Sequence, residues 1–197
     1  SSTSTASSAE AMPREMADGL LARAVAKAGV AGAYAEADSE LGRRVSAIAS
    51  EGGSVYLWGK PGRGKTYAAA QAVRDAVMSG YLPECRQPAA LCHVSRTLAA
   101  MRRDIDEGES WRVPFLERVP LLALDDLGAE RMTEWAVEQV ASIIDARSYA
   151  GLPTIVTSNL SVGELREAVG GIQGARLASR LSAYERIEVT GRDRRTA

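Results

Sequence analysis

The sequence of 197 residues is long enough for one globular domain, and 46% of its residues are hydrophobic, which is enough to build a buried core. Its formal net charge of -1 excludes a globally basic nucleic-acid-binding protein, although a local basic patch stays compatible with it. No apolar run approaches the length of a membrane span, so we expect no membrane partner. Two cysteines and a single histidine favour reduced thiols over a metal site, and we expect a cytoplasmic location.

The N-terminal quarter of the chain is predicted to consist of a flexible tail followed by helices. Residues 1–11 are rich in Ser, Thr and Ala and are expected to form a flexible tail. Residues 12–50 are expected to form an N-terminal helical segment with two helices, 13–28 and 39–50, because their apolar residues recur at helical spacing. Glycines at 52 and 53 end the second helix, and residues 51–197 are expected to form one further domain.

Strands and helices alternate in that domain. The expected strands are Ser54–Trp58, Ala89–Val94, Val119–Leu124, Pro153–Thr157 and Glu185–Val189. The expected helices are Lys65–Met78, Ser95–Ile105, Thr133–Ser148, Val162–Val169 and Gly174–Ala183, with Ser95 and Thr133 as N-caps. This alternation is typical of an α/β fold in which helices cover both faces of a parallel sheet.

The first strand leads into a loop that reads GKPGRGKT, Gly59 to Thr66, and matches the pattern G-x-x-x-x-G-K-[ST] in full. Glycines let the backbone N–H groups turn towards phosphate oxygens, and the helix that follows adds its positive N-terminal end. Lys65 is expected to contact the β- and γ-phosphates, and Thr66 to offer a hydroxyl to Mg²⁺. The nucleotide-contacting residues predicted here are Gly59, Pro61, Gly62, Arg63, Gly64, Lys65, Thr66 and Tyr67. At the variable positions, Lys60 and Arg63 are interpreted first as solvent-facing charge with a general attraction for phosphate.

Two aspartates follow the apolar run LLAL, at the C-terminal edge of a buried strand. Ligands of open α/β sheets bind at that edge. Asp125 is expected to hold Mg²⁺, directly or through water, and Asp126 to polarise the attacking water. The alternative is a helix N-cap.

The strand in PTIVTSN, Pro153 to Asn159, also ends in polar residues. In P-loop ATPases with an additional strand, this strand lies between the two strands already described. Asn159 is then expected to reach the γ-phosphate and the water, because its amide can donate to one and accept from the other. The alternative role for Asn159 is to cap the helix at Val162.

Arginines gather towards the end of the chain. Arg176 and Arg180 are four residues apart, which places them on one face of a helix, and GRDRR follows from Gly191 to Arg195. These arginines could be solvated surface charge. Alternatively, one of them reaches the γ-phosphate bound to a neighbouring subunit. Arg180 is the first candidate for that role.

These motifs together resemble the AAA+ helicase loaders of the DnaC/DnaI type, which are related to the IstB-like ATP-binding proteins. The similarity extends from about Tyr34 to Arg195 and is most specific in Leu121–Leu165 and Gly174–Arg195. The resemblance implies a three-layer P-loop NTPase of the additional-strand (ASCE) class, with five parallel strands in the order 5-1-4-3-2, helices on both faces and no C-terminal lid. It also implies Mg²⁺-dependent hydrolysis of ATP.

The same resemblance implies partners. They are a replicative DNA helicase, single-stranded DNA, and further copies of the chain that associate through Arg180 as arginine finger, with Arg176 one turn earlier at the same interface. It further implies a DNA-contacting insertion at Arg96–Trp111, which contains Arg96, Arg102 and Arg103, although four acidic residues follow those arginines. Loaders often end the acidic pair in Glu, so the shorter Asp126 leaves the rate of hydrolysis open.

Two other functions stay open at this point. One is an IstB-like transposition helper, an ATPase that assembles on duplex DNA. The other is a nucleotide-dependent assembly scaffold with little turnover. Loading the replicative helicase onto single-stranded DNA is the favoured prediction.

Overall fold

The computed structural model describes residues 14–80, 87–128 and 132–191. The expected N-terminal tail, Cys85, Ala129, Glu130 and the three arginines of GRDRR lie outside these residues. The strands are β1 (Val55–Trp58), β2 (Ala89–His93), β3 (Leu121–Leu127), β4 (Thr154–Ser158) and β5 (Glu185–Glu188). The α-helices are α1 (Arg14–Lys27), α2 (Glu40–Ser50), α3 (Lys65–Gly80), α4 (Val94–Asp106), α5 (Arg112–Arg118), α6 (Glu134–Tyr149), α7 (Val162–Val169) and α8 (Gly171–Ser182). A short 3₁₀ helix, η1, covers Gly32–Tyr34.

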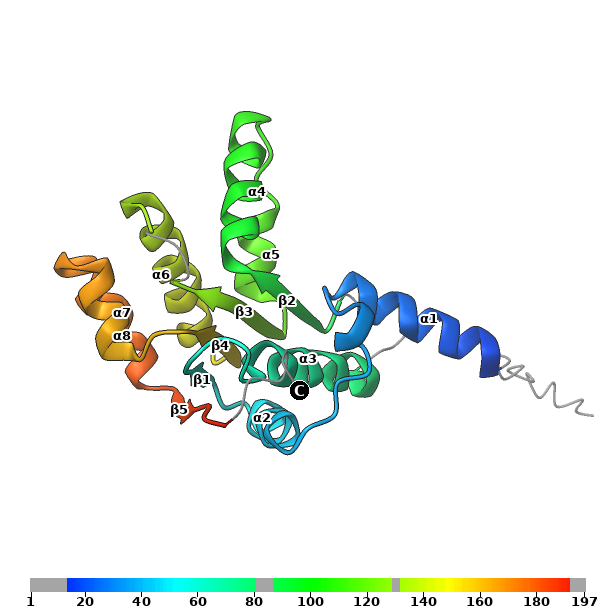
Figure 1. Ribbon diagram of the computed structural model, residues 1–197. Coiled ribbons are helices and arrows are strands. Elements are labelled where there is room, and N and C mark those ends of the chain that lie inside the picture. Colours follow the sequence, from blue (N-terminus) through cyan, green and yellow to red (C-terminus); the bar gives the residue numbers. More distant parts are fainter. Residues whose placement is uncertain (1–13, 81–86, 129–131, 192–197) are drawn as a thin grey trace, which may run out of the picture.

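The five strands form one sheet in the order β2-β3-β4-β1-β5, and every neighbouring pair is parallel. This is the expected order, with the strand of PTIVT between the phosphate-loop strand and the strand with the two aspartates. Because all strands run the same way, their carboxyl ends meet at one edge of the sheet. That edge therefore receives the loop after β1 and the polar residues of β3 and β4 (Figure 1).

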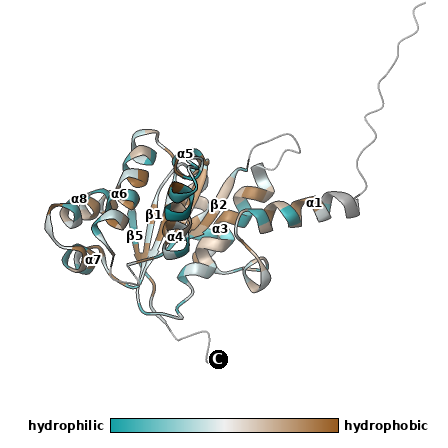
Figure 2. Cartoon of the chain, turned by 90° about the horizontal axis from the view of Figure 1, so that it is seen from above, coloured by the Kyte–Doolittle hydropathy of each residue, from teal (hydrophilic) through white to brown (hydrophobic). Residues whose placement is uncertain are grey.

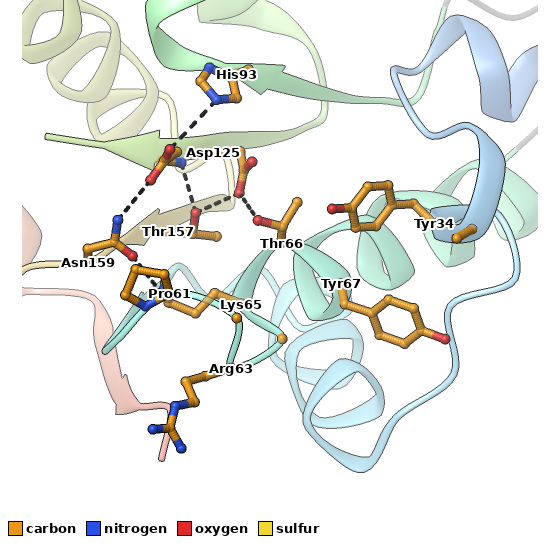
Figure 3. Close-up of a pocket in the computed structure, with 14 residues that line it drawn as sticks. Tyr34, Pro61, Arg63, Lys65, Thr66, Tyr67, His93, Asp125, Thr157 and Asn159 are labelled. Carbon is orange, nitrogen blue, oxygen red and sulfur yellow. Dashed lines mark hydrogen bonds and ion pairs between the residues drawn. The ribbon is translucent and has the colours of Figure 1, made fainter. Parts of the chain in front are cut away.

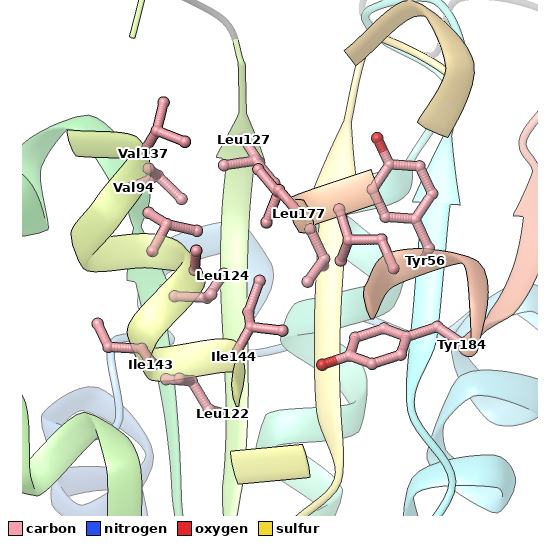
Figure 4. Close-up of a cluster of buried hydrophobic side chains, with 14 of the residues drawn as sticks. Tyr56, Val94, Leu122, Leu124, Leu127, Val137, Ile143, Ile144, Leu177 and Tyr184 are labelled. Carbon is pink, nitrogen blue, oxygen red and sulfur yellow. The ribbon is translucent and has the colours of Figure 1, made fainter. Parts of the chain in front are cut away.

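Alternate residues of the central strands enter two separate cores. On one face, Leu122 and Leu124 of β3 join a buried cluster that includes Ile144 of α6 and Leu177 of α8 (Figure 4). On the other face, residues from α1, α2 and α3 complete a second cluster around Val55. The result is the expected three-layer arrangement, with a sheet between two layers of helices.

The N-terminal helices contribute to this second core. Val25 of α1 and Val45 of α2 are buried there, and Gln71 of α3 accepts a hydrogen bond from the backbone N–H of Ser39 at 2.8 Å. The division between an N-terminal segment, 12–50, and a following domain stays a prediction. The contacts show that residues on both sides of residue 50 share one core.

Two local expectations need correction, and a third is confirmed. Strand β3 does not end before the two aspartates but continues through them to Leu127, with an irregular register between Leu124 and Leu127. Helix α4 begins at Val94, so Ser95 is not its N-cap; the Ser95 hydroxyl instead lies 3.2 Å from Nδ1 of His93. Thr133 is confirmed as the N-cap of α6, since its side chain accepts from the N–H of Ala136.

Helix α5 was not predicted. It spans seven residues and has Pro114 as its third residue. Proline is tolerated in the first turn of a helix because the N–H groups there have no partner within the helix. The far end of α4 extends beyond the sheet (Figure 1), while Val94 and Met101 of α4 and Leu116 of α5 are buried in the core cluster. The residues of α4 also include many hydrophilic ones (Figure 2). None of the helices described is both long and apolar enough to cross a membrane.

One buried charge supports the opposite edge of the sheet. Arg147 of α6 is fully buried and donates hydrogen bonds to the carbonyls of Leu116, Val119, Pro120 and Pro153, and to the Thr154 hydroxyl. Burial lowers the pKa of its guanidinium to about 10. Arg147 therefore remains charged near neutral pH, and its N–H groups tie α6 to the segments that precede β3 and β4.

Candidate active site

A cavity of about 720 Å³ opens at the carboxyl edge of the sheet. It is lined by Ala33, Tyr34, Pro61, Gly62, Arg63, Gly64, Lys65, Thr66, Tyr67, His93, Asp125, Asp126, Thr157 and Asn159 (Figure 3). The volume lies in the range of small-molecule and cofactor sites. The cavity gathers residues from five separate parts of the sequence: η1, the loop after β1 with the start of α3, and the carboxyl ends of β2, β3 and β4.

The phosphate loop has the backbone geometry that its glycines allow. Gly62 and Gly64 have φ values of 75° and 94°, in the left-handed region that side chains disfavour. Helix α3 starts directly at Lys65, so its first N–H groups have no partner within the helix and its positive end faces the cavity. Gly59 lies outside the cavity lining; a Cβ there would lie 2.6 Å from the carbonyl oxygen of Val189. Position 59 therefore requires glycine, because any side chain there would collide with the segment after β5.

Lys65 is buried at the base of the loop. Its Nζ donates to the carbonyls of Gly59 at 2.6 Å and Lys60 at 2.9 Å, and to Oδ1 of Asn159 at 2.9 Å. These bonds hold the ammonium group between the loop and the end of β4. Lys60 itself does not line the cavity, whereas Arg63 does.

Thr66 and Asp125 are joined directly. The Thr66 hydroxyl donates to Oδ1 of Asp125 at 2.8 Å, and the Thr157 hydroxyl donates to the same oxygen at 2.6 Å (Figure 3). A hydroxyl and a carboxylate at this distance are hard oxygen ligands of the kind that Mg²⁺ prefers. Within residues 14–80, 87–128 and 132–191, no three His, Cys, Asp or Glu side chains converge on a common point. This donor set fits Mg²⁺ of the type that is shared with nucleotide phosphates and water, because such sites use few protein ligands.

Asp126 has an unusual backbone. Its φ is 63°, the only positive value for a non-glycine residue among those described, and its N–H donates to the Thr157 hydroxyl at 2.9 Å. In a regular strand, adjacent side chains point to opposite faces. The left-handed conformation and the irregular register allow Asp125 and Asp126 to line the same cavity. Aspartate tolerates this conformation better than most residues, and backbone outliers of this kind cluster at functional sites.

Asn159 links the lysine to the second aspartate. Its Oδ1 accepts from Lys65, and its Nδ2 donates to Oδ1 of Asp126 at 3.3 Å. It does not cap α7, because Ser161 fills that position with a complete capping box. Asn159 therefore faces the cavity, in the place from which its amide could contact both a phosphate and a water molecule.

Sequence reasoning missed His93 as a site residue. It closes β2, and its Nε2 lies 3.7 Å from Oδ2 of Asp126, on the side opposite Asn159. The only sequence signal was the position of His93 at the end of a predicted strand. Its proximity to Asp126 depends on β2 and β3 being neighbours in the sheet, where His93 pairs with Asp125.

Two tyrosines border the other end of the cavity. The rings of Tyr34 in η1 and Tyr67 in α3 lie 6.4 Å apart at an interplanar angle of 53°. Tyr67 was among the predicted nucleotide contacts, whereas Tyr34 was not. Flat aromatic faces at a cavity mouth are suited to contact a planar ring.

The two candidate arginines lie elsewhere. Arg176 and Arg180 of α8 are absent from the cavity lining and both bind Asp145 of α6. Their side chains are 57% and 52% exposed. In this arrangement neither arginine reaches the cavity of its own chain. The predicted role as arginine finger therefore requires the cavity of another copy.

Comparison with known proteins supports a relation to helicase loaders. No family model matches the chain. The replicative helicase loader DnaI of Bacillus subtilis (strain 168) is 30% identical over 118 residues, which are 59% of this chain and 36% of DnaI. The chain thus spans about a third of the length of this curated relative.

Solved structures agree on the fold. A DnaI structure superposes with a TM-score of 0.63 at 23% identity, covering 93% of this chain and 94% of that one. The DnaC helicase loader gives 0.65 at 21%, covering 81% and 100%. The replication initiator DnaA bound to AMPPCP and single-stranded DNA gives 0.62 at 19%, covering 83% and 48%. The expected three-layer fold with a parallel five-stranded sheet is confirmed, and so is the resemblance to helicase loaders of the DnaC/DnaI type.

Proposed function

We propose that this chain, a relative of the AAA+ helicase loaders of the DnaC/DnaI type, binds ATP with Mg²⁺, hydrolyses it, and loads a replicative helicase onto single-stranded DNA. One observation carries the ATPase part of the proposal. Lys65, the linked pair Thr66–Asp125, Asp126 and Asn159 face a single cavity at the carboxyl edge of the sheet. We expect the protein to act in the cytoplasm.

Each residue has a role that its position supports. The glycine-rich loop and the start of α3 bind the phosphates with backbone N–H groups, and Lys65 exchanges its carbonyl partners for phosphate oxygens. Thr66 and Asp125 are the residues that would hold Mg²⁺, which compensates phosphate charge when it is bound. Asp126 orients the attacking water and accepts its proton, while Asn159 keeps the water and the γ-phosphate in register.

The base of the nucleotide is expected to lie at the tyrosine end of the cavity. Tyr34 is 40% exposed and Tyr67 is partly buried, so a purine entering between η1 and α3 would cover apolar ring surface. Ala33 lines the cavity beside them and leaves room for a flat ring. Removal of this aromatic surface from water would add to binding without touching the phosphates.

Arginines on α4 are proposed to contact DNA. Arg96, Arg102 and Arg103 are all exposed, and Arg102 also lies over the ring of Trp135, with 4.7 Å from its Cζ to the ring centroid. Asp104 and Asp106 follow Arg103 in the last turn of α4 and would repel phosphate there, so the contact is expected to be stronger at Arg96, near the start of the helix. Arg96→Ala with Arg103→Ala should weaken single-stranded DNA binding and flatten its salt dependence, and Arg118→Ala on α5 is the matched control.

The helicase part of the proposal is tested by direct binding. The purified chain is mixed with a replicative helicase hexamer and single-stranded DNA, with and without ATP, and the composition of the complex is measured by mass. A ternary complex that forms only with ATP supports the proposal. Binding to a transposase and duplex DNA, with the helicase left unbound, would instead identify an IstB-like transposition helper.

A scaffold with little turnover is the second candidate, and the acidic pair favours it. The second acidic residue is Asp126, whose side chain is one methylene shorter than Glu and therefore reaches less far towards a water molecule. ATP hydrolysis measured at saturating ATP, alone and with the helicase, separates the two functions. Turnover that stays at background in both states, with ATP-dependent assembly intact, would select the scaffold.

A further inference from the structure

One carboxylate binds both exposed arginines of α8. Oδ2 of Asp145 accepts from Nη2 of Arg176 at 2.6 Å, and Oδ1 accepts from Nε of Arg180 at 2.5 Å. The two arginines are one helical turn apart, and Asp145 comes from the neighbouring helix α6. Two positive charges therefore share one negative charge, and the group keeps a net attraction for phosphate.

The bond to Arg180 leaves the outer edge of its guanidinium open. Only Nε is used, so Nη1 and Nη2 have no acceptor among the described residues of this chain. Those two nitrogens form a planar pair of donors that matches two oxygens of a phosphate group. At 52% exposure, the side chain can be reached from outside the molecule.

The position of Asp145 is fixed by packing that does not depend on its charge. Its neighbour Ile144 is buried in the same apolar cluster as Leu177 and Leu181, which directly follow Arg176 and Arg180 in sequence (Figure 4). Asp145 lies at the rim of this helix pair and is 18% exposed. Loss of the carboxylate should therefore free the two arginines and leave the helices in place.

We propose that Asp145 is a positioning residue for the arginine finger: it holds the Arg180 guanidinium ready for the γ-phosphate bound to a second copy of this chain. The inference rests on the proposed ATPase function and on Arg180 acting across a subunit interface. An unrestrained arginine side chain samples many rotamers, and ordering it each time it meets a γ-phosphate costs conformational entropy. Asp145 orders the Arg180 side chain before it meets the phosphate, and Arg176 binds the other oxygen of the same carboxylate.

Mixing two inactive variants tests this inference. Lys65→Ala, at ATP concentrations below its weakened affinity, binds little nucleotide and keeps the finger, whereas Arg180→Ala binds nucleotide and lacks the finger. If the finger acts in trans, the mixture recovers ATP turnover that neither variant shows alone. Replacing the donor by the double variant Lys65→Ala, Asp145→Asn should then lower the recovered rate at least about tenfold, because the finger is no longer prealigned.

A matched control carries Lys65→Ala with Asp104→Asn. Asp104 is 14% exposed and also binds one arginine, Arg112, but between α4 and α5. This donor should work as well as Lys65→Ala alone. Thermal unfolding of each donor checks that it is folded, and Asp145→Glu, which retains the carboxylate, should recover most of the rate.

Three results would overturn the inference. Equal rates with the Asp145→Asn donor and the Lys65→Ala donor would show that the carboxylate does not position the finger. A faster rate with Asp145→Asn would mean that Asp145 restrains the finger instead. If Lys65→Ala and Arg180→Ala never complement each other, the finger does not act across subunits, and that failure counts against the proposed self-association as well.

Discussion

The cavity at the sheet edge and the arginine pair on α8 differ in how complete they are within one chain. In the cavity, Lys65, Asp125 and Asn159 each bind other side chains or carbonyls of the same site. On α8, the outer edge of Arg180 points away from any partner among the described residues. The first region can bind a ligand within one chain, whereas the second is proposed to supply half of a site that a second copy completes. A protein with both can couple nucleotide hydrolysis to assembly, and the following changes test the two halves separately.

Arg180→Ala should have the largest effect. We expect ATP turnover in the assembled state to fall by about 10³- to 10⁵-fold, because an arginine finger stabilises charge that develops in the transition state. ATP affinity should stay unchanged, since Arg180 does not line the cavity of its own chain. Steady-state hydrolysis and equilibrium nucleotide binding measure the two quantities. Arg186→Ala, which changes another exposed arginine, is the control. A loss of ATP affinity in Arg180→Ala would contradict the prediction, because it would mean that Arg180 contacts the nucleotide bound to its own chain.

Asp126→Asn should lower turnover by about 10²- to 10⁴-fold, because the amide cannot accept the proton of the attacking water. Asparagine tolerates the left-handed backbone that Asp126 adopts at φ 63°, so the variant should fold and bind ATP normally. Turnover close to that of the unchanged chain would remove Asp126 from the catalytic role and favour another base.

Lys65→Ala should weaken ATP binding by about 100-fold, which corresponds to the loss of a charge-assisted contact of nearly 3 kcal/mol. Lys60→Ala is the matched control in the same loop, and we expect it to change ATP affinity little because Lys60 does not line the cavity. Titration of a fluorescent ATP analogue measures both affinities. Equal losses in the two variants would mean that the loop attracts phosphate by charge alone.

Tyr34→Ala should have the smallest effect on the cavity. We expect ATP affinity to fall about five- to tenfold, the range for losing one aromatic face against a base. Tyr149→Ala removes a tyrosine that is 97% exposed at the end of α6 and should leave affinity unchanged. Comparison of ATP with inorganic triphosphate sharpens the test, because the triphosphate should bind both Tyr34→Ala and the unchanged chain equally.

Features that depend on local sequence were predictable. The phosphate loop is recognisable from eight consecutive residues. The strand order was predicted from the family resemblance, which rests on the loop, the acidic pair and the polar end of the strand in PTIVTSN. Strand and helix positions were close, because apolar periodicity is a local property. Helix α5 was missed since it is short and contains Pro114, which suggests a turn when only the sequence is read.

The sequence by itself therefore determined which residue types stand at the ends of β1, β3 and β4, and these led to the class of ligand that we propose. Only the tertiary structure decided three further points: that Asp126 turns into the cavity through a left-handed backbone, that His93 lies beside it, and that Asp145 holds Arg176 and Arg180. The physical reason is that these contacts join residues from different elements. Their meeting depends on strand order and helix packing, which no short stretch of sequence encodes.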